Sequence, residues 1–438
     1  MKLAHYIVPV LALAAIAGCR TAPTAAERVE RERLESVGKT FLPEYRPALP
    51  ALTADSAPAD YLRWAMLNQP AVTAAYFDWA AAVARIPAAR TPPDPRLTIQ
   101  ADIQSVITSL MPGLMFDFPG PGKLAAGAEV ASAESEMKYH AFAKSALQAA
   151  FDLKKACWDL RTLDTRLELN RQMAALLAET EKIAEARNAT GTAMLPDVLR
   201  ARIEREQLLS EIRNLEDSRA LLLERFKAAL GLTPEQPAPP PPTQFFPESP
   251  AGAETAVRLE AALQRNPGLR AMQADIRRAD VELAMTRKAK IPDFTAGLEA
   301  DLKMAPILFR PQAGMTLPVW RERIASDISA AESAKKSAEA KLAAERIALA
   351  AEFAEKRFMV REAERNLELL SKQLIPLTER ALEAAKSGYA AGTGDFLMLL
   401  DTQRTLLGFR LRQEDARLQR ELSLAALALV LGGGDATP

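Results

Sequence analysis

The chain has 438 residues, with 56 basic and 56 acidic side chains, so its formal net charge is zero. This balance gives no sign of the basic surface that marks nucleic-acid-binding proteins. Two cysteines and two histidines are too few for a clustered metal site. We therefore expect neither a metal site nor a nucleic-acid partner.

Residues 1–18 have the pattern of a signal peptide, with a charged start, a short apolar run and small residues before a cleavage point. The stretch Ile16-Ala17-Gly18-Cys19 resembles the lipobox of bacterial lipoproteins, which implies lipidation of Cys19. An ordinary signal peptide with an incidental cysteine is the alternative. Residues 19–57 are predicted to be a lipid-anchored N-terminal tether, and no cofactor is expected beyond this covalent lipid.

A first repeat is predicted over residues 58–232, opening with a helix from about Pro58 to Ala89 that a cluster of prolines ends. Apolar and polar residues then alternate, which predicts strands over about 96–118 with a turn near Ser109–Gly113. Each strand has about the length that a tilted strand needs to cross a bilayer. The alternation is typical of transmembrane barrel strands, although an amphipathic hairpin on a soluble core shows the same pattern.

No Gly or Pro occurs between Ala128 and Thr190, which predicts a long helix over about 120–188 and a returning helix over 193–230. Leucines along these helices recur in steps of three and four, as in coiled coils. A proline-rich linker is predicted over 233–253. The second repeat is predicted over residues 254–432, with strands over about 293–317, a long helix over about 320–387 and a returning helix over 395–432. Residues 433–438 are predicted to be a tail.

The two repeats share landmarks at a spacing of about 200 residues. Phe118-Pro119 recurs as Leu317-Pro318, and Gly191-Thr192 recurs as Gly392-Thr393. So long a period indicates a duplicated structural unit rather than a short-repeat solenoid. Each unit consists of a helix, a β-hairpin, a long helix and a shorter returning helix.

This order resembles the TolC-type outer-membrane efflux proteins over essentially the whole mature chain. The most specific stretch runs from Gly388 to Leu397, and Arg265-Asn266-Pro267 resembles the motif that opens a repeat in that family. The resemblance implies a mainly α fold with a transmembrane β-barrel, formed by a homotrimer. Twelve strands would close the barrel in the cell outer membrane, and an α-helical tube would continue it through the periplasm. The implied partners are a periplasmic adaptor (membrane fusion) protein, an inner-membrane pump and outer-membrane lipid.

The resemblance also suggests site residues. An adaptor-docking tip would include Gly191, Thr192, Tyr389, Gly392 and Thr393, although helix capping alone explains most of these residues. The candidate gate at the end of the tube comprises Asp401 and Asp395, and for each a structural role is the alternative. Met398 and Gly394 occupy positions where some family members carry an acidic residue and an arginine, so this chain has only part of the gate that the resemblance implies.

The predicted function is passive conduction of small molecules or ions from the periplasm to the outside, without catalysis. No phosphate-binding loop, nucleophile motif or metal cluster suggests an enzyme. The alternative is a periplasmic coiled-coil structural lipoprotein without a pore. An adaptor protein is disfavoured because two helical hairpins and little strand are predicted. The sequence does not identify the cargo, which is left open among drugs, metal ions and secreted proteins.

Overall fold

A computed structural model describes residues 22–38, 40–42, 47–103, 107–243, 259–260 and 263–432. The chain divides into two compact units, each of which draws segments from both repeats. Unit 1 comprises residues 1–46, 74–143 and 267–346, and unit 2 comprises residues 47–73, 144–266 and 347–438. Cys19, the predicted lipidation residue, lies outside the described residues.

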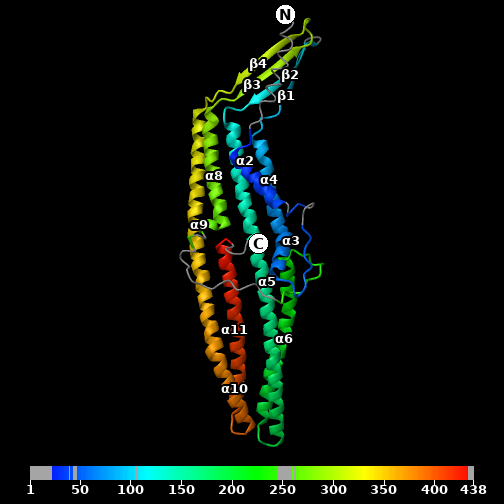
Figure 1. Ribbon diagram of the computed structural model, residues 1–438, viewed down its shortest axis with the longest axis vertical. Helices are drawn as coiled ribbons and strands as arrows, with labels where there is room; N and C mark the ends of the chain where they lie inside the picture. Colours follow the sequence, from blue (N-terminus) through cyan, green and yellow to red (C-terminus); the bar gives the residue numbers. More distant parts are fainter. Residues whose placement is uncertain are drawn as a thin grey trace. The chain divides into compact units, whose positions relative to one another are not determined.

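Long helices dominate the fold (Figure 1). The α-helices are α2 (Ala25–Gly38), α3 (Pro58–Asn68), α4 (Pro70–Ala89), α5 (Lys123–Ala189), α6 (Leu195–Ala229), α8 (Pro267–Arg287), α9 (Arg321–Leu369), α10 (Ile375–Ala390) and α11 (Phe396–Val430). A 3-10 turn (Lys288–Lys290) follows α8, and a π-helical turn (Leu370–Leu374) joins α9 to α10. None of the helices within the described ranges has the length and apolar character of a membrane span.

Prolines divide two helices that were predicted as continuous. The expected helix from Pro58 to Ala89 is interrupted at Gln69, whose backbone is extended (φ −68°, ψ 117°) because Pro70 follows it. The second long helix, expected over about 320–387, contains the π-helical turn directly before Pro376. Pro196 lies in the first turn of α6, where proline fits without a lost hydrogen bond. Pro376 lies within a helical path, as expected, because the residues of the π-helical turn and Ile375 precede it in helical conformation.

Four antiparallel strands form one sheet in unit 1, in the order β1 (Arg96–Ile103), β2 (Ile107–Phe118), β3 (Phe294–Asp301) and β4 (Leu308–Met315). The turn expected near Ser109–Gly113 is wrong, because these residues belong to β2. Pro112 is tolerated there since the pairing of β2 with β3 begins only at Gly113.

The two faces of the sheet differ in exposure. The apolar face is exposed, with Leu97 at 71% and Phe309 at 60%. The opposite face carries Glu299 and Asp301, each 3% exposed, and also Met111. The register gives the pairs of residues that are neighbours on adjacent strands and share this face, for example Gln100 with Met111 and Glu299 with Arg310. The alternation in the sequence thus corresponds to two chemically distinct faces.

Both repeats close on themselves in unit 2 by the same hydrogen bond. Asn68 Nδ2 donates to the carbonyl oxygen of Leu230 at 3.0 Å, and Asn266 Nδ2 donates to that of Val430 at 2.9 Å. After each acceptor the chain turns through a glycine with positive φ, Gly231 at 70° and Gly432 at 74°. A side chain at residue 231 would lie 2.6 Å from the oxygen of Asn68. These equivalent contacts are the structural counterpart of the sequence duplication.

The segment expected as a tether contains helix α2, which packs inside unit 1. Glu30 on α2 accepts hydrogen bonds from Ser135 Oγ at 2.8 Å and from Trp79 Nε1 at 3.4 Å. Glu27, fully buried, forms ion pairs with Arg31 and Arg90. Buried carboxylates require such partners, so α2 is fixed in position rather than loosely attached.

Candidate functional site at the hairpin tips

The first hairpin tip connects α5 to α6 within unit 2. Gly191 adopts a left-handed conformation (φ 76°), and the backbone N–H of Thr192 donates to the carbonyl of Arg187 at 2.8 Å. The hydroxyl of Thr192 donates to the same carbonyl at 3.0 Å. Asn188 Nδ2 donates to the carbonyl of Ala193 at 2.9 Å. The bonds from Thr192 satisfy the carbonyl of Arg187, one of those left free at the end of α5, and the bond from Asn188 holds the turn.

The second tip, between α10 and α11, has the same design. Gly392 has φ 83°, and the N–H of Thr393 donates to the carbonyl of Gly388 at 3.0 Å. Asp395 caps α11, since its carboxylate accepts from the N–H of Leu397 at 3.2 Å. The capping role considered for Gly392 and Asp395 from the sequence is confirmed. Docking of an adaptor at either tip stays a prediction.

Arg187 joins the two tips of one chain. Its guanidinium lies over the ring of Tyr389, 4.5 Å from the ring centre, and Nη1 donates to the backbone carbonyl of Tyr389. Nη2 donates to the carbonyl of Thr192 at 3.2 Å, so one side chain contacts both turns. Burial raises the pKa of Tyr389, and its hydroxyl has no hydrogen-bond partner among the described residues. The tyrosine therefore contributes its ring and its backbone rather than its hydroxyl.

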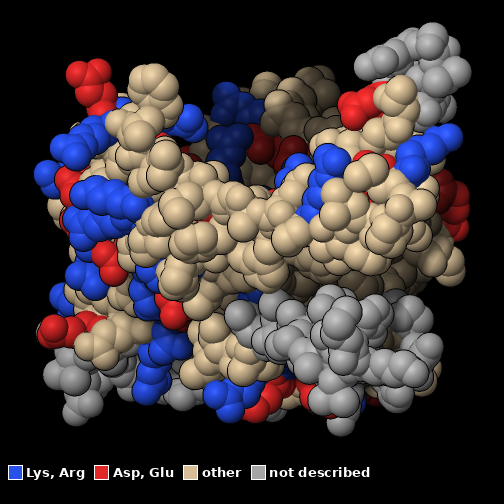
Figure 2. Space-filling model, turned by 90° about the horizontal axis from the view of Figure 1, so that it is seen from above, with Lys and Arg blue, Asp and Glu red and all other residues tan. Residues whose placement is uncertain are grey.

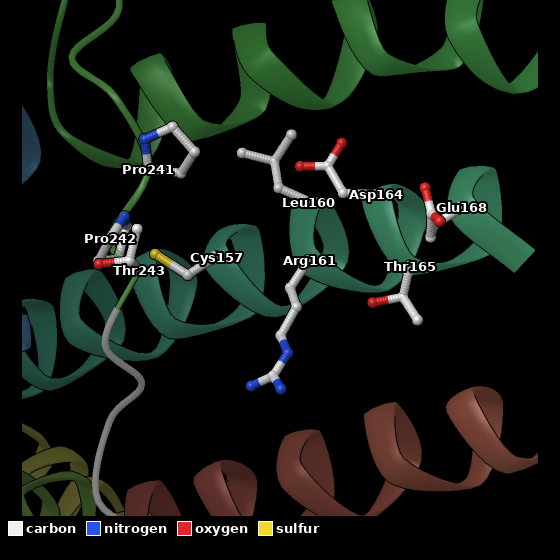
Figure 3. Close-up of a pocket in the computed structure, with 9 residues that line it drawn as sticks. All are labelled: Cys157, Leu160, Arg161, Asp164, Thr165, Glu168, Pro241, Pro242 and Thr243. Carbon is white, nitrogen blue, oxygen red and sulfur yellow. The ribbon is translucent and has the colours of Figure 1, made fainter. Parts of the chain in front are cut away.

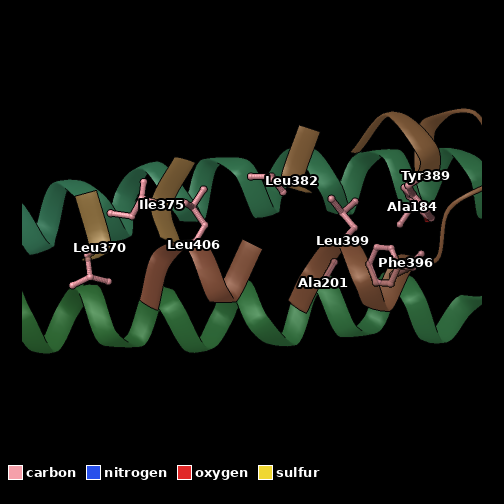
Figure 4. Close-up of a cluster of buried hydrophobic side chains, with 10 residues drawn as sticks. Ala184, Ala201, Leu370, Ile375, Leu382, Tyr389, Phe396, Leu399 and Leu406 are labelled. Atoms are coloured by element: carbon pink, nitrogen blue, oxygen red, sulfur yellow. The ribbon is translucent and has the colours of Figure 1, made fainter. Parts of the chain in front are cut away.

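A buried apolar cluster lies next to the tips in unit 2, between the two hairpins (Figure 4). Its members are Ala184, Val198, Ala201, Leu370, Ile375, Leu382, Tyr389, Phe396, Leu399 and Leu406. Each large member contributes about 1.5–3 kcal/mol by burial, so this cluster stabilises the packing of the two hairpins. Gln403 crosses the same interface, where its Nε2 donates to Thr180 Oγ1 at 2.9 Å.

The two candidate gate residues have different surroundings. Asp395 is used in capping, as described above. Asp401 is exposed on α11, and it makes no ion pair or hydrogen bond within the described part of the chain. Met398, one turn before Asp401, is 63% exposed. Asp401 is thus available to face a solvent-filled space, and its role in a gate stays a prediction.

A further hollow of about 380 Å³ runs along α5 in unit 2, beside residues 241–243 (Figure 3). Cys157 and Leu160 form its buried floor, and Arg161 and Asp164 lie at its sides. Burial raises the pKa of Cys157 to about 12, so its thiol is protonated and unreactive at neutral pH. Within the described ranges, no three His, Cys, Asp or Glu side chains are grouped as metal ligands.

Two features escaped the sequence analysis. Arg187 gave no signal, because a single arginine near a helix end is usually solvated. His140 gave no signal of burial either, although it lies on the inner side of α5. It is 6% exposed and its Nε2 lies 3.8 Å from a carboxylate oxygen of Glu136.

Comparisons with known proteins support the same architecture. Residues 259–433 match the family described as outer membrane efflux protein. The chain is 25% identical over 264 residues to the cobalt-zinc-cadmium resistance protein CzcC of Cupriavidus metallidurans, covering 56% of this chain and 59% of that protein. It is 30% identical over 186 residues to the pyoverdine export outer membrane protein OpmQ of Pseudomonas putida, covering 39% and 38%.

The chain thus spans less than two thirds of the length of either relative. Among solved structures, the outer-membrane channel OprN resembles it with a TM-score of 0.76 at 17% sequence identity. That alignment covers 86% of this chain and 90% of the other. At this identity the likeness establishes a shared fold, so the predicted fold class of long helical hairpins joined to a small sheet is confirmed.

Proposed function

We propose, from the match of residues 259–433 to the family described as outer membrane efflux protein, that this chain is an outer-membrane channel. It would serve as the channel component of a tripartite efflux or export system, together with a periplasmic adaptor and an inner-membrane pump. Cargo would pass from the periplasm to the outside by diffusion. Passage through a pore involves no bond making or breaking, so no enzymatic step belongs to the proposal.

The observation that carries the proposal is the sheet with two unlike faces and two open edges. The outer strands β1 and β4 each pair with one neighbour. A bilayer offers no hydrogen-bond partners to a free edge, so a sheet with an exposed apolar face is stable there only as part of a closed barrel. Three copies of four strands supply twelve, with Leu97 and Phe309 toward lipid and Glu299 toward the lumen. The homotrimer is the oligomeric state that the resemblance to TolC-type proteins implies, and it would supply this closure.

Oligomeric state and conductance test the proposal directly. The full chain, extracted in detergent from outer membranes, should have the mass of three protomers by light scattering and should form conducting pores in planar bilayers. The main competing function is a coiled-coil structural lipoprotein without a pore. A monomer or dimer that conducts no ions, and that leaves the membrane once its lipid anchor is removed, would favour that competitor.

The lipid anchor is a separate part of the proposal. Cleavage before Cys19 and acylation of its thiol would attach the chain to the outer membrane next to helix α2, which begins only six residues later at Ala25. Mass spectrometry of the N-terminal peptide should show the acyl chains on the natural protein and none after Cys19→Ala. An unmodified Cys19 in the mature protein would rule out lipidation.

The cargo is proposed only as a broad class. The name of one relative refers to resistance to metals, which are ions, and the name of the other refers to export of pyoverdine, a small molecule. We propose that this chain conducts small molecules or ions of this range, and that the pump rather than the channel selects among them.

A further inference from the structure

The connection between β4 and α9 presents apolar, aromatic and basic side chains to solvent in unit 1. Leu317, Val319 and Trp320 are exposed by 67%, 62% and 73%. Arg321 and Arg323 follow directly, at the start of α9. Exposure of an indole next to two other large apolar side chains is unfavourable in water, so this segment is built for another environment.

The basic residues here are not used in strong ion pairs. Arg323 Nε lies 4.0 Å from the carboxylate of Asp327, with the arginine side chain 80% exposed. Arg321 has no ion pair or side-chain hydrogen bond with any described residue. Together with Glu322 and the two neighbours Val319 and Trp320, these arginines line an open hollow of about 610 Å³.

A second basic segment lies at the same end of the sheet. Asp293, just before β3, and Thr316, just after β4, are joined by two hydrogen bonds of 2.8 Å. This places Lys288 and Lys290, in the 3-10 turn before Asp293, on the same side of the sheet as Arg321. Figure 2 shows Lys and Arg side chains along its left edge, with Asp and Glu side chains among them.

We propose that Trp320, Arg321 and Arg323 bind the headgroup of an anionic phospholipid, in the leaflet that this end of the sheet enters. The proposal rests on the proposed function, because it takes the exposed strand faces to lie in a bilayer. Guanidinium groups hold phosphate oxygens in pairs, and tryptophan favours the boundary between headgroups and acyl chains. Leu317 and Val319 continue the apolar strand face represented by Met315, 59% exposed, to this boundary.

Charge favours an anionic over a zwitterionic headgroup. The two segments carry four basic residues, Lys288, Lys290, Arg321 and Arg323, against the carboxylates of Glu322 and Asp293. Asp293 is already paired with Lys123, and Lys288 Nζ donates to the carbonyl of Gly122 at 2.8 Å. Each basic side chain near an anionic surface adds attraction that a zwitterionic lipid does not supply. A purely apolar segment would give no such preference between lipids.

The test uses the full chain in detergent and follows its thermal unfolding while short-chain phosphatidylglycerol, phosphatidylcholine or inorganic phosphate is added. Phosphatidylglycerol should stabilise the protein at lower concentrations than phosphatidylcholine, and inorganic phosphate should have little effect. Arg321→Gln with Arg323→Gln should weaken the response to phosphatidylglycerol about tenfold. Trp320→Ala should weaken the response to both lipids.

A matched control is Arg361→Gln with Arg365→Gln, on the same helix and equally exposed, which should leave the response unchanged. Equal stabilisation by the two lipids, or an unchanged response in the Arg321 and Arg323 variant, would overturn the proposal. Saturation by inorganic phosphate alone would indicate a free-phosphate site, and loss of the trimer in that variant would indicate contact between copies. Both outcomes would also overturn it.

The same preparations separate this inference from the proposed function. A trimer that conducts ions but does not distinguish the lipids contradicts the lipid site alone. A protein that neither forms a trimer nor conducts contradicts the channel itself, whatever lipid it binds.

Discussion

Arg187 and Tyr389 form a contact across 202 residues of sequence, through a ring face and a backbone carbonyl rather than through the tyrosine hydroxyl. Arg187 ends the first long helix and Tyr389 ends the second. One side chain thus contacts both hairpin tips of one chain, in addition to the buried cluster between the hairpins. Loosening this contact is the most direct way to let the tips separate.

Replacing Arg187 by Ala should loosen the tips. The variant loses a cation–π contact of about 1 kcal/mol and a charge-assisted hydrogen bond of about 1.5–3 kcal/mol. We expect several-fold faster chymotrypsin cleavage near Phe396 and a higher single-channel conductance. Tyr389→Phe keeps the ring and the carbonyl and removes a buried hydroxyl without a partner, so it should behave like the natural protein.

Arg380→Ala serves as the control for a lost arginine, since Arg380 is exposed on α10. It should leave cleavage and conductance unchanged. If Tyr389→Phe opened the tips as much as Arg187→Ala, the hydroxyl would be the essential group and the geometry proposed for this contact would be wrong.

The change in stability caused by replacing a glycine with alanine should depend on the backbone conformation of that glycine and on the space around it. Gly191→Ala places a side chain at φ 76° without a clash, so it should cost about 1 kcal/mol. Gly231→Ala adds a contact of 2.6 Å with the oxygen of Asn68 and should cost more. Gly408→Ala, inside α11 with open space around it, should stabilise by about 0.5–1 kcal/mol. Thermal unfolding of the three variants measures this order, and an equal effect of all three would contradict it.

Acid should weaken unit 1 through Glu136. The imidazole of His140, 3.8 Å away, followed by the ion pair with Arg277, lowers the pKa of Glu136 from 4.5 to about 2. The stabilisation is therefore complete above pH 4.5 and is lost as the pH falls toward 2. Glu136→Gln should lower the stability at pH 7 by about 2 kcal/mol, and the difference from the natural protein should shrink below pH 4.5.

Glu129→Gln, on the exposed face of the same helix, is the control and should show no such difference at any pH. Unfolding of the three proteins between pH 7 and pH 3 gives the comparison. A gap between Glu136→Gln and the natural protein that stays constant down to pH 3 would mean that ionisation of Glu136 is not the cause.

Asp401 should influence ion selectivity if the channel proposal is correct. Three exposed carboxylates, one from each copy, would favour cations in a narrow tube. Asp401→Asn should lower the ratio of cation to anion permeability measured by reversal potential. Glu383→Gln, an exposed carboxylate on α10, should leave the ratio unchanged, whereas equal effects of the two variants would remove Asp401 from the gate.

Local patterns in the sequence predicted most of the fold. The absence of Gly and Pro indicated α5, and alternation in residues 294–301 indicated β3, because these signals depend on neighbours in sequence. The break at Gln69 also has a local cause, since Pro70 disfavours the helical conformation of the residue before it. The position of β2 could not be predicted from local patterns, because Pro112 and Gly113 are residues typical of turns. They are placed in a strand only by the pairing of β2 with β1 and β3.

The candidate site was predictable only in part. Gly191 and Gly392 stood out because a helix end with positive φ requires glycine. Arg187 and Gln403 did not, because their partners lie more than 200 residues away and no local pattern relates them. The burial of His140 likewise depends on how α5 is turned within unit 1.

The matching asparagine bonds also limit how a chain of this kind changes length in evolution. Asn68 and Leu230 are separated by 162 residues, and Asn266 and Val430 by 164. An insertion in one helix would shift its tip and break the contact of Arg187 with Tyr389. Lengthening therefore requires equal insertions in all four helical arms, and steps of about seven residues would preserve the packed faces. Long and short relatives should accordingly differ by whole heptads, added in both repeats together.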